Sequence, residues 1–356
     1  MRIIQLLPTL SFGDAIGNDT IALDGAMKAM GFNSEIYAEN IDKRLPKDIA
    51  QKTEKLRGLK NDDIIIYHKS TGTDLTFKLD SFNCRRMMVY HNITPPEFFR
   101  DYSATATQLT EYGYDGVKYL RDKVEYCLAD SGYNRNELLK MGYTCPIDVR
   151  PILIKFEDYR QTPDAETVAK YRDGKKNLVF VGRIAPNKRQ ENVIRAFYQY
   201  RKLNPDSRLI LVGSYLGMEN YYQRLVKYAK ALGIEDDVVF TGHIKFSEIL
   251  AFYHVADAFV CMSEHEGFCV PLVEAMFFNV PVIAYDTSAI SDTLGGSGVL
   301  LDSNDPVFTA HVINRVLTDE KLRESIVEGQ KKRLEDFSYE RIKDIFEKQL
   351  KGFINK

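Results

Sequence analysis

The chain has 356 residues, of which 44% are hydrophobic and 28% charged, a composition typical of a globular protein with about two domains. Its 48 basic and 50 acidic side chains nearly cancel, which disfavours nucleic-acid binding, because that class usually carries a strong basic excess. Five scattered cysteines without a C-x-x-C pair disfavour a disulfide framework or a zinc site, and no apolar run reaches the ~18 residues of a membrane span.

Short apolar runs alternate with amphipathic stretches over the first 150 residues, a pattern that predicts a parallel sheet with crossover helices. The apolar start of the chain lacks a signal-peptide cleavage pattern and is interpreted as a buried strand, so we expect a cytoplasmic protein. The expected strands are Arg2–Leu7, Ser34–Ala38, Asp62–Tyr67, Arg86–Tyr90 and Glu125–Ala129. The expected helices are Thr20–Met30 and Asn134–Met141.

Residues from about 150 to 176 are charged and turn-rich, and we interpret them as a connection, after which the alternation restarts. The strands expected next are Asn177–Val181, Arg208–Val212, Val238–Phe240, Ala258–Cys261 and Val280–Ala284. The helices expected between and after them are Arg189–Leu203, Tyr221–Leu232, Ser247–His254, Pro271–Phe278, Pro306–Leu317 and Glu320–Leu334. The chain therefore predicts two doubly wound α/β domains, with a ligand bound at the carboxyl ends of the strands, in a cleft between the domains.

A last helical stretch, Tyr339–Phe353, has an apolar face. The residues spaced along that face are Ile342, Ile345, Phe346, Leu350 and Phe353.

The strongest chemical signal is the stretch 264–276, EHEGFCVPLVEAM, which follows an expected strand and opens an expected helix. The N–H groups of such a turn and helix N-terminus suit a diphosphate or sugar hydroxyls. Beside them, the carboxylates of Glu266 and Glu274 could accept hydrogen bonds from vicinal hydroxyls, one set on a hexose and one on a ribose. A capped helix with two solvated glutamates is the alternative.

A second signal, FVGRIAPNKR, lies at the carboxyl end of the first strand of the second domain. Gly182 permits a tight turn, and Arg183 and Lys188 could converge on one anion from either end of the loop. Arginine offers a bidentate fork and lysine a point charge, and both suit a diphosphate. A solvated basic loop is the alternative.

Together these motifs resemble the retaining, nucleotide-sugar-dependent glycosyltransferases of the GT-B fold in glycosyltransferase family 4, the glycosyl transferases group 1. The resemblance extends through LPTLSFGDAIGND, YHNITPPEFF and LADSGYNRNELLKMGY and covers nearly the whole chain. It implies two Rossmann-like domains facing across a cleft. Residues 1–155 would form the acceptor-side domain, with a C-terminal helix 339–356 packing back on it, and residues 176–338 the nucleotide-sugar-binding domain.

The resemblance also implies roles for individual residues. Arg183 and Lys188 would hold the donor diphosphate, Glu266 would contact the donor hexose, and Glu274 the nucleotide ribose. His91, after an expected strand, would contact the donor sugar near the reacting carbon, with a structural histidine as the alternative. Further contacts to the nucleotide sugar would come from Gly17, Gly182, Gly213, Ile244, Gly267, Phe268, Cys269 and Val270.

On the acceptor side, Asp14 and His68 are candidates, and structural roles for His68 and for the glycines near Asp14 stay open. The chain departs from the family pattern at Cys269, where the family usually has glycine, and at Ser291-Asp292, where it often has Pro-Glu. We expect no metal and no cofactor, because positive side chains and a helix terminus would replace a divalent ion beside the leaving diphosphate.

The expected function is therefore retaining transfer of a hexose from a UDP- or GDP-linked donor to a glycan, lipid-linked or other hydroxyl acceptor, in surface polysaccharide or glycoconjugate synthesis. A sugar-nucleotide epimerase of the same fold and a non-catalytic subunit are the alternatives. Residues Lys43–Lys60 hold seven basic and two acidic side chains. They fit either peripheral contact with anionic lipid at the inner face of the cell membrane or a solvated helix face.

Overall fold

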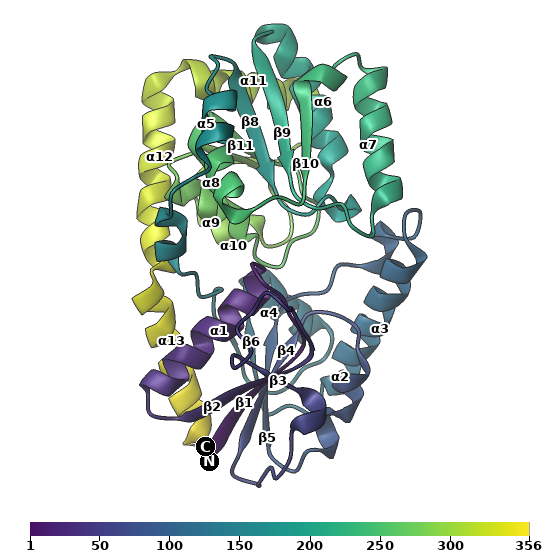
Figure 1. The fold of residues 1–356 in the computed structure, drawn as a ribbon, viewed down its shortest axis with the longest axis vertical. Helices are drawn as coiled ribbons and strands as arrows, with labels where there is room; N and C mark the ends of the chain where they lie inside the picture. The colour runs from purple at the N-terminus through teal and green to yellow at the C-terminus, as the bar shows by residue number, and fades with distance from the viewer. Residues whose placement is uncertain (356) are drawn as a thin grey trace. The chain divides into compact units, whose positions relative to one another are not determined.

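Two parallel sheets organise the computed structural model, which describes residues 1–355 (Figure 1). The first has the strand order β3-β2-β1-β4-β5-β6-β7 and the second the order β10-β9-β8-β11-β12-β13. Every pair of neighbouring strands is parallel. Parallel strands need crossover connections, which helices usually supply. The chain forms two compact units: residues 1–96, 105–155 and 336 onward, and residues 97–104 with 156–335.

The first unit covers both faces of its sheet with helices. Its strands are β1 (Arg2–Leu10), β2 (Asn33–Ile41), β3 (Gln51–Lys52), β4 (Ile64–Lys69), β5 (Arg85–Tyr90), β6 (Tyr126–Ala129) and β7 (Ile147–Val149). Its helices are α1 (Ala15–Ala29), α2 (Asp74–Lys78), α3 (Ala104–Leu120), α4 (Gly132–Lys140) and α13 (Tyr339–Ile354). Successive side chains of β4 point to opposite faces, so Ile64 packs with α1 and α13, and Ile65 packs with α2, α3 and α4. This double cover explains why every residue of the strand is buried, including His68 and Lys69 at its end.

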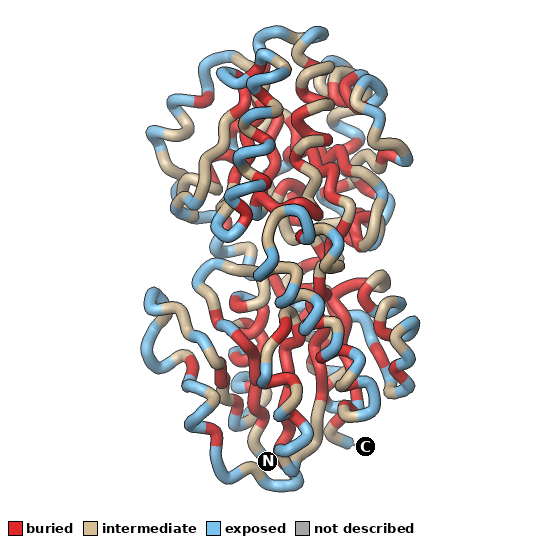
Figure 2. The backbone as a smooth tube through the Cα atoms, turned by 90° about the vertical axis from the view of Figure 1, so that its right-hand side faces the viewer, coloured by how far each residue is buried: buried red, intermediate tan, exposed pale blue. Residues whose placement is uncertain are grey.

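The second unit repeats the arrangement. Its strands are β8 (Lys176–Val181), β9 (Ser207–Val212), β10 (Val238–Gly242), β11 (Ala258–Cys261), β12 (Val282–Tyr285) and β13 (Val299–Leu301). Its helices are α5 (Ala165–Tyr171), α6 (Gln190–Leu203), α7 (Glu219–Ala231), α8 (Phe246–Val255), α9 (Val270–Phe277), α10 (Ile290–Leu294), α11 (Pro306–Thr318) and α12 (Glu320–Leu334). Buried residues follow the strands of each sheet and the inner faces of the helices (Figure 2).

Helix α3 is the largest element that the sequence pattern did not predict, and its glycines explain why. A Cβ atom on Gly113 would lie 2.9 Å from the side chain of Ile93, and one on Gly116 would lie 2.7 Å from Lys69 Nζ. The helix passes so close to its neighbours that these two positions need glycine. Glycine is a poor helix former, and it leaves a gap in the apolar periodicity on which the prediction depends.

The unit boundaries correct the boundaries expected from the sequence. Residues 97–104, assigned to the first domain, belong to the second unit, where the Tyr102 ring packs on Tyr221 with centroids 5.1 Å apart. Residues 156–176, expected as a connection, contain a 3-10 turn, η4 (Phe156–Arg160), and helix α5, both in the second unit. The chain re-enters the first unit at Asp336.

Helix α13 completes the core of the first unit. Ile342, Phe346 and Leu350 are fully buried, together with side chains of α1 and β5. The ring of Phe353 stacks on Tyr126 with centroids 5.8 Å apart. The last helix therefore supplies apolar surface to a sheet formed by the first 150 residues (Figure 1).

We predict that Phe346→Ala lowers the free energy of unfolding of the first unit by about 3–5 kcal/mol, because it leaves a cavity in the core. Lys348→Ala changes an exposed residue of the same helix and should stay within about 0.5 kcal/mol. Denaturant titration of both variants measures the difference. Equal stability of the two variants, or a chain ending at Ser338 that melts like the full chain, would mean that α13 does not contribute to this core.

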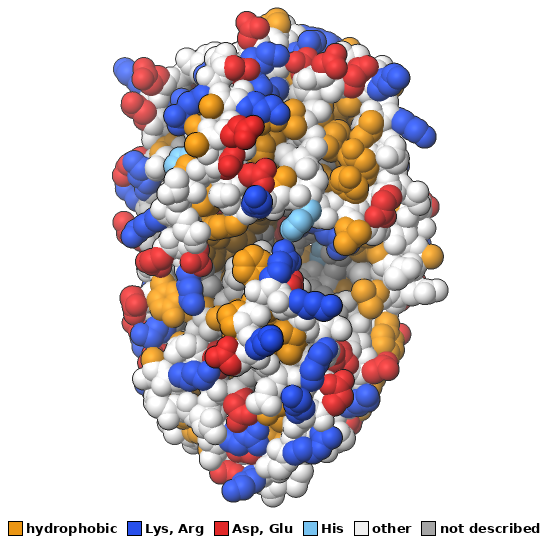
Figure 3. All heavy atoms as spheres, viewed as in Figure 1, with side chains coloured by type: hydrophobic (Ala, Val, Ile, Leu, Met, Phe, Trp, Pro, Cys, Tyr) orange, Lys and Arg blue, Asp and Glu red, His pale blue; other side chains and the backbone are white. Residues whose placement is uncertain are grey.

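The basic segment Lys43–Lys60 is not a helix, which corrects one of the two interpretations of it. It contains only strand β3 and a 3-10 turn, η1 (Thr53–Lys55), and all seven of its basic side chains are exposed. On the face shown in Figure 3, basic and acidic side chains are interspersed. No helix within residues 1–355 is long and apolar enough to cross a membrane.

Candidate functional site

Closely packed glycines end three neighbouring strands of the second sheet. Gly182 follows β8 and Gly213 follows β9, with φ angles of 152° and 149° that favour glycine. A Cβ atom on Gly213 would lie 2.0 Å from the carbonyl oxygen of Gly182, so no other residue fits there. The Gly213 N–H donates to Thr241 Oγ1 at 3.3 Å, beside Gly242 at the end of β10. The loops after these strands therefore leave one edge of the sheet together.

The two chemical motifs recognised in the sequence form one hydrogen-bonded unit. The Glu264 N–H donates to the Asn187 carbonyl at 2.9 Å, and the Asn187 side-chain amide donates to the His265 carbonyl at 3.0 Å. The Glu266 N–H donates to Ser288 Oγ at 2.9 Å. Asn187 and Ser288 were not predicted as site residues, because their role depends on contacts between distant parts of the chain.

An ion pair joins the motifs at their charged ends. Lys188 Nζ bonds the carboxylate of Glu266, which is only 6% exposed. Burial disfavours the charge on Lys188, but the neighbouring carboxylate outweighs it and raises the pKa of Lys188 above its ordinary value. Lys188 therefore stays charged, and an incoming anion would share it with Glu266.

Arg183 lies in the same loop as Lys188 but forms no ion pair like that of Lys188. Its side chain is exposed, and the guanidinium donates to the Leu216 carbonyl at 3.1 Å. Within residues 1–355, no carboxylate lies in ion-pair distance of it, taken as 4.0 Å. Of the two predicted anion ligands, Arg183 is thus the cation that is available to an external anion.

The backbone at Cys269 explains why the family pattern has glycine there. Cys269 precedes α9 with φ 70° and ψ 67°, the left-handed region that side chains disfavour. Its sulfur, the sulfur of Cys261 and a carboxylate oxygen of Glu266 lie within 4.8 Å of one another. The contact with Cys261, burial and the nearby carboxylate raise the pKa of the Cys269 thiol.

This grouping of two thiols and a carboxylate was not foreseen from the sequence, which predicted no metal cluster. Its residue types would suit a thiophilic metal ion. The ammonium of Lys188, however, already binds the Glu266 carboxylate, and the Cys261 sulfur contacts Ser263 Oγ at 3.3 Å. The geometry therefore favours an ion pair between Lys188 and Glu266 beside the two thiols.

We predict that Cys269→Gly is more stable than Cys269→Val by roughly 2 kcal/mol, because a β-branched residue is penalised most in the left-handed conformation and glycine least. Both variants remove the thiol, so the comparison isolates the backbone effect. Their melting temperatures measure it, and a valine variant as stable as the glycine variant would contradict the assigned conformation.

Glu274, on α9, is held by two tyrosines that the sequence did not indicate. Its Oε1 accepts a hydrogen bond from the Tyr159 hydroxyl at 2.8 Å, and its Oε2 accepts one from Tyr253 at 2.6 Å. Burial raises the pKa of Glu274, although both hydroxyls oppose the shift. Tyr159 comes from η4, in the segment expected to be a simple connection. Each carboxylate oxygen keeps a second lone pair, so Glu274 can still accept a bond from a ligand hydroxyl.

The remaining predicted donor contacts lie in loops after strands of the same sheet. Gly267, Phe268 and Val270 surround the start of α9, and the Phe268 carbonyl accepts a hydrogen bond from the Thr293 hydroxyl. Ile244 is half-buried in the loop after β10. The first N–H groups of α9 add the positive end of a helix to this edge of the sheet.

In the first unit, Asp14 and Gly17 close the turn between β1 and α1. Asp14 caps the helix, since its Oδ1 accepts from the N–H groups of Ile16 at 2.7 Å and Gly17 at 3.2 Å. A Cβ atom on Gly17 would lie 2.5 Å from the Ser11 carbonyl oxygen. Asp14 and Gly17 therefore both have a structural role in this turn, which does not depend on a ligand.

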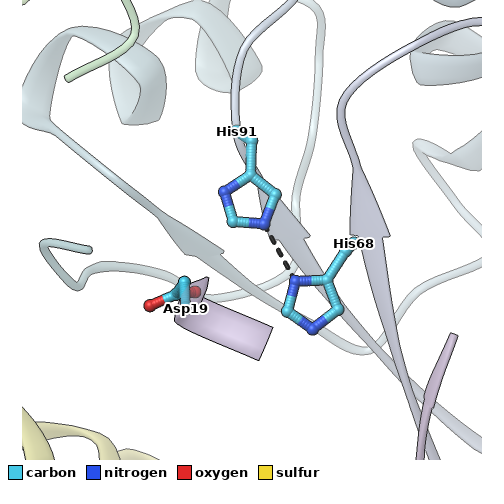
Figure 4. Close-up of side chains that lie close together, drawn as sticks. All are labelled: Asp19, His68 and His91. Atoms are coloured by element: carbon cyan, nitrogen blue, oxygen red, sulfur yellow. Dashed lines mark hydrogen bonds between the residues drawn. The ribbon is translucent and has the colours of Figure 1, made fainter. Parts of the chain in front are cut away.

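The two predicted histidines of the first unit are bonded to each other (Figure 4). His68 Nδ1 and His91 Nε2 are 2.9 Å apart, and the rings stack with centroids 5.2 Å apart. The other ring nitrogen of His68 faces Gln5 Oε1 at 2.9 Å, and that of His91 faces Asp130 Oδ2 at 2.8 Å. All four nitrogens are thus engaged. Both imidazoles therefore already have hydrogen-bond partners inside the first unit, and their predicted contacts with substrate stay predictions.

A buried ion pair lies beside the histidines. Arg150 binds Asp19 through both terminal nitrogens, at 2.8 and 2.7 Å, and both side chains are fully buried. The Leu153 N–H also donates to Asp19, at 2.8 Å. Asp19, His68 and His91 offer ligand-type atoms within 4.8 Å of one another. Because these atoms bond Arg150 and each other, the group is a closed polar network rather than a vacant metal site.

Two Rossmann-like domains with this strand topology define the GT-B class of proteins. Residues 163–333, a little under half of the chain, match the family model described as Glycosyl transferases group 1. The match confirms the resemblance drawn from the sequence motifs.

Curated relatives support this assignment over part of their length. The D-inositol 3-phosphate glycosyltransferase of Salinispora tropica is 32% identical over 179 residues, 48% of this chain and 37% of that protein. The lipopolysaccharide 1,2-N-acetylglucosaminetransferase of Salmonella typhimurium is 33% identical over 190 residues, 50% of this chain and 49% of that protein. The matched segments thus span between about two fifths and one half of these relatives.

Solved structures match the whole chain. Anabaena HepE in complex with UDP and glucose superposes with a TM-score of 0.77 at 19% identity, covering 99% of this chain and 100% of that one. WaaG, a glycosyltransferase involved in lipopolysaccharide biosynthesis, gives a TM-score of 0.70 at 13% identity, covering 96% and 97%. At this level of identity the comparison shows the fold, which is the predicted GT-B fold.

Proposed function

We propose that the protein is a retaining glycosyltransferase that moves a hexose from a UDP- or GDP-linked donor to a hydroxyl acceptor on a glycan or lipid-linked glycan. The observation that carries the proposal is the pairing of Lys188 with Glu266, next to the unpaired Arg183 and the start of α9. Cations and helix N–H groups suit a diphosphate, and a fixed carboxylate suits sugar hydroxyls. The named activities of the relatives support a role in glycoconjugate or surface polysaccharide synthesis.

In the proposed reaction the bond between the anomeric carbon and the diphosphate oxygen breaks, and the acceptor oxygen bonds the anomeric carbon on the same face. The acceptor proton passes to the departing phosphate oxygen, so no protein base is needed. Arg183, Lys188 and the N–H groups of α9 stabilise the charge that develops on the diphosphate. Glu266 accepts hydrogen bonds from the hexose. Its tight ion pair with Lys188 makes it a poor nucleophile.

Glu274 is the proposed ribose ligand. Tyr159 and Tyr253 fix the direction of its carboxylate before a nucleotide arrives, which lowers the entropic cost of binding. His91 would approach the donor only through its main chain, because both ring nitrogens are bonded inside the first unit. The charged residues of the donor site argue against a non-catalytic subunit.

A lipid-linked acceptor would bring the protein to the inner face of the cell membrane. The seven exposed basic side chains of residues 43–60 support a peripheral contact with anionic lipid there.

We predict that Arg183→Ala lowers kcat by about 10²–10³, with a smaller effect on the donor KM, because this cation stabilises charge that appears only as the glycosidic bond breaks. Its melting temperature should stay close to that of the wild type, since the side chain is exposed. Lys188→Ala should lower both kcat and the melting temperature, because it leaves the buried Glu266 carboxylate without its partner.

Steady-state kinetics and thermal melts of the two variants make this comparison, with Glu274→Ala as the reference. Since the ribose keeps its charge during the reaction, Glu274→Ala should mainly raise the donor KM. The assigned roles are wrong if Glu274→Ala loses more kcat than Arg183→Ala, or if Lys188→Ala keeps full turnover.

We also predict that activity survives an excess of EDTA, because side-chain cations and helix N–H groups take the place of a divalent ion at the diphosphate. The measurement is nucleoside diphosphate release with and without chelator, followed by addition of Mg²⁺ or Mn²⁺. Turnover that is lost with EDTA and restored by either ion would refute metal independence.

A further inference from the structure

The buried histidine pair lies in a chain of hydrogen bonds whose direction is fixed at one end. The Gln5 amide nitrogen, on β1, donates to the main-chain carbonyl of Thr20 at 2.9 Å. A carbonyl can only accept, so the nitrogen of this amide must face Thr20 and its oxygen must face His68. Gln5 Oε1 is therefore an acceptor, 2.9 Å from His68 Nε2.

This direction determines where the protons are. Because Gln5 offers an oxygen, His68 Nε2 must carry a hydrogen. Burial holds the pKa of His68 well below its ordinary value, so the ring is neutral and its Nδ1 is a bare acceptor. His91 Nε2, 2.9 Å away, must then donate to it. His91 Nδ1 faces the Asp130 carboxylate and donates as well, which leaves His91 with a proton on both nitrogens.

A charged His91 gives the buried group around it a net charge of zero. Asp19 from α1 and Asp130 after β6 are acidic, Arg150 after β7 is basic, and all three are buried. Arg150 neutralises Asp19 and lies 4.0 Å from Asp130. A charged His91 supplies the second positive charge of the group. Burial opposes that charge, but Asp130 outweighs it and raises the pKa of His91.

We propose that Gln5 and His68 are positioning residues that keep His91 doubly protonated and so fix the His91–Asn92 turn at the carboxyl end of β5. Asn92 has φ 74°, a strained conformation for a residue other than glycine. Its side chain is tied to Asn134 Oδ1 at 2.9 Å and Glu137 Oε2 at 3.0 Å. The turn is thus held from both sides: by the amide of Asn92 and by the charged ring of His91.

The effect on transfer rests on the proposed function, in which this turn meets the donor through its main chain. His91 has a raised pKa, so its charge is fully present below the ordinary value of 6.5 and is lost as pH rises through the pKa in the folded protein. Loss of that charge leaves Asp130 unpaired beside the turn. We therefore expect kcat to fall on the alkaline side of a single ionisation that belongs to His91.

The first test observes the protons directly and needs no activity. In histidine-labelled wild-type protein at pH 6, below the ordinary histidine pKa of 6.5, nitrogen NMR should show both ring nitrogens of His91 protonated and only Nε2 of His68 protonated. A neutral His91, or a His68 protonated on Nδ1, would overturn the proposal without any variant.

The second test uses two isosteric variants, His68→Asn and His68→Leu. Asparagine can present an oxygen where His68 Nδ1 accepts, whereas leucine cannot. His91 should keep its proton affinity within about twofold in the asparagine variant and lose about tenfold or more in the leucine variant. The alkaline limb of the kcat profile should shift to lower pH in the leucine variant, together with the pKa of His91. If the leucine variant does not fold, Gln5→Leu serves, because it frees His68 to reverse its tautomer and should also lower the proton affinity of His91.

The outcomes separate this proposal from the proposed function. Equal His91 titration in the asparagine and leucine variants would overturn the positioning role even in an active enzyme. The expected NMR result together with an absence of transfer from every donor tried would uphold the proton arrangement and contradict the glycosyltransferase activity. If the pKa of His91 shifts in a variant and the alkaline limb of the kcat profile does not shift with it, the charge of His91 does not act on transfer.

Discussion

The ion pair between Lys188 and Glu266 is the interaction on which the proposed site depends. It joins two segments about 80 residues apart, and each brings its own backbone partners: the Asn187 bonds on one side and Ser288 on the other. A buried carboxylate without a cation would be costly, so the pair fixes both charges before any ligand arrives. Arg183 is left outside the pair, so its guanidinium is the cation available to an external anion. Gly213 is needed because its backbone lies against that of Gly182, and Gly182 is favoured because its φ angle of 152° is one that other residues rarely adopt.

The first unit contains a different kind of polar core. Its carboxylates, guanidinium and imidazoles are all buried, and they bond one another across the ends of strands that are far apart in the sequence. Such a network is more favourable the more of its donors meet acceptors and the better its charges cancel, and here only Asp130 Oδ1 and Arg150 Nε lack a hydrogen-bond partner among the described side chains of the network. That preference assigns the protons of His68 and His91 more firmly than burial alone would.

The sequence predicted most strands and the two-domain architecture, because continuous apolar runs and helical periodicity are properties of short stretches. It missed helix α3, whose Gly113 and Gly116 are set by close packing that no local pattern shows. It predicted Arg183, Lys188, Glu266 and Glu274 as site residues, because each lies in a short motif that can be recognised within one stretch of the chain. It could not find Tyr159, which meets Glu274 across 115 residues of chain, or the bond between His68 and His91, which depends on the order of the strands.

The central claim is that this chain transfers a hexose from a nucleoside-diphosphate sugar. The most direct measurement is phosphorus NMR of the purified protein with UDP- and GDP-linked hexoses and a glycan acceptor, combined with the anomeric configuration of the product. The account predicts acceptor-dependent release of the nucleoside diphosphate from at least one donor, with the anomeric configuration of the donor retained. A product of inverted configuration, or no release and no nucleotide-dependent rise in melting temperature with any donor, would contradict it.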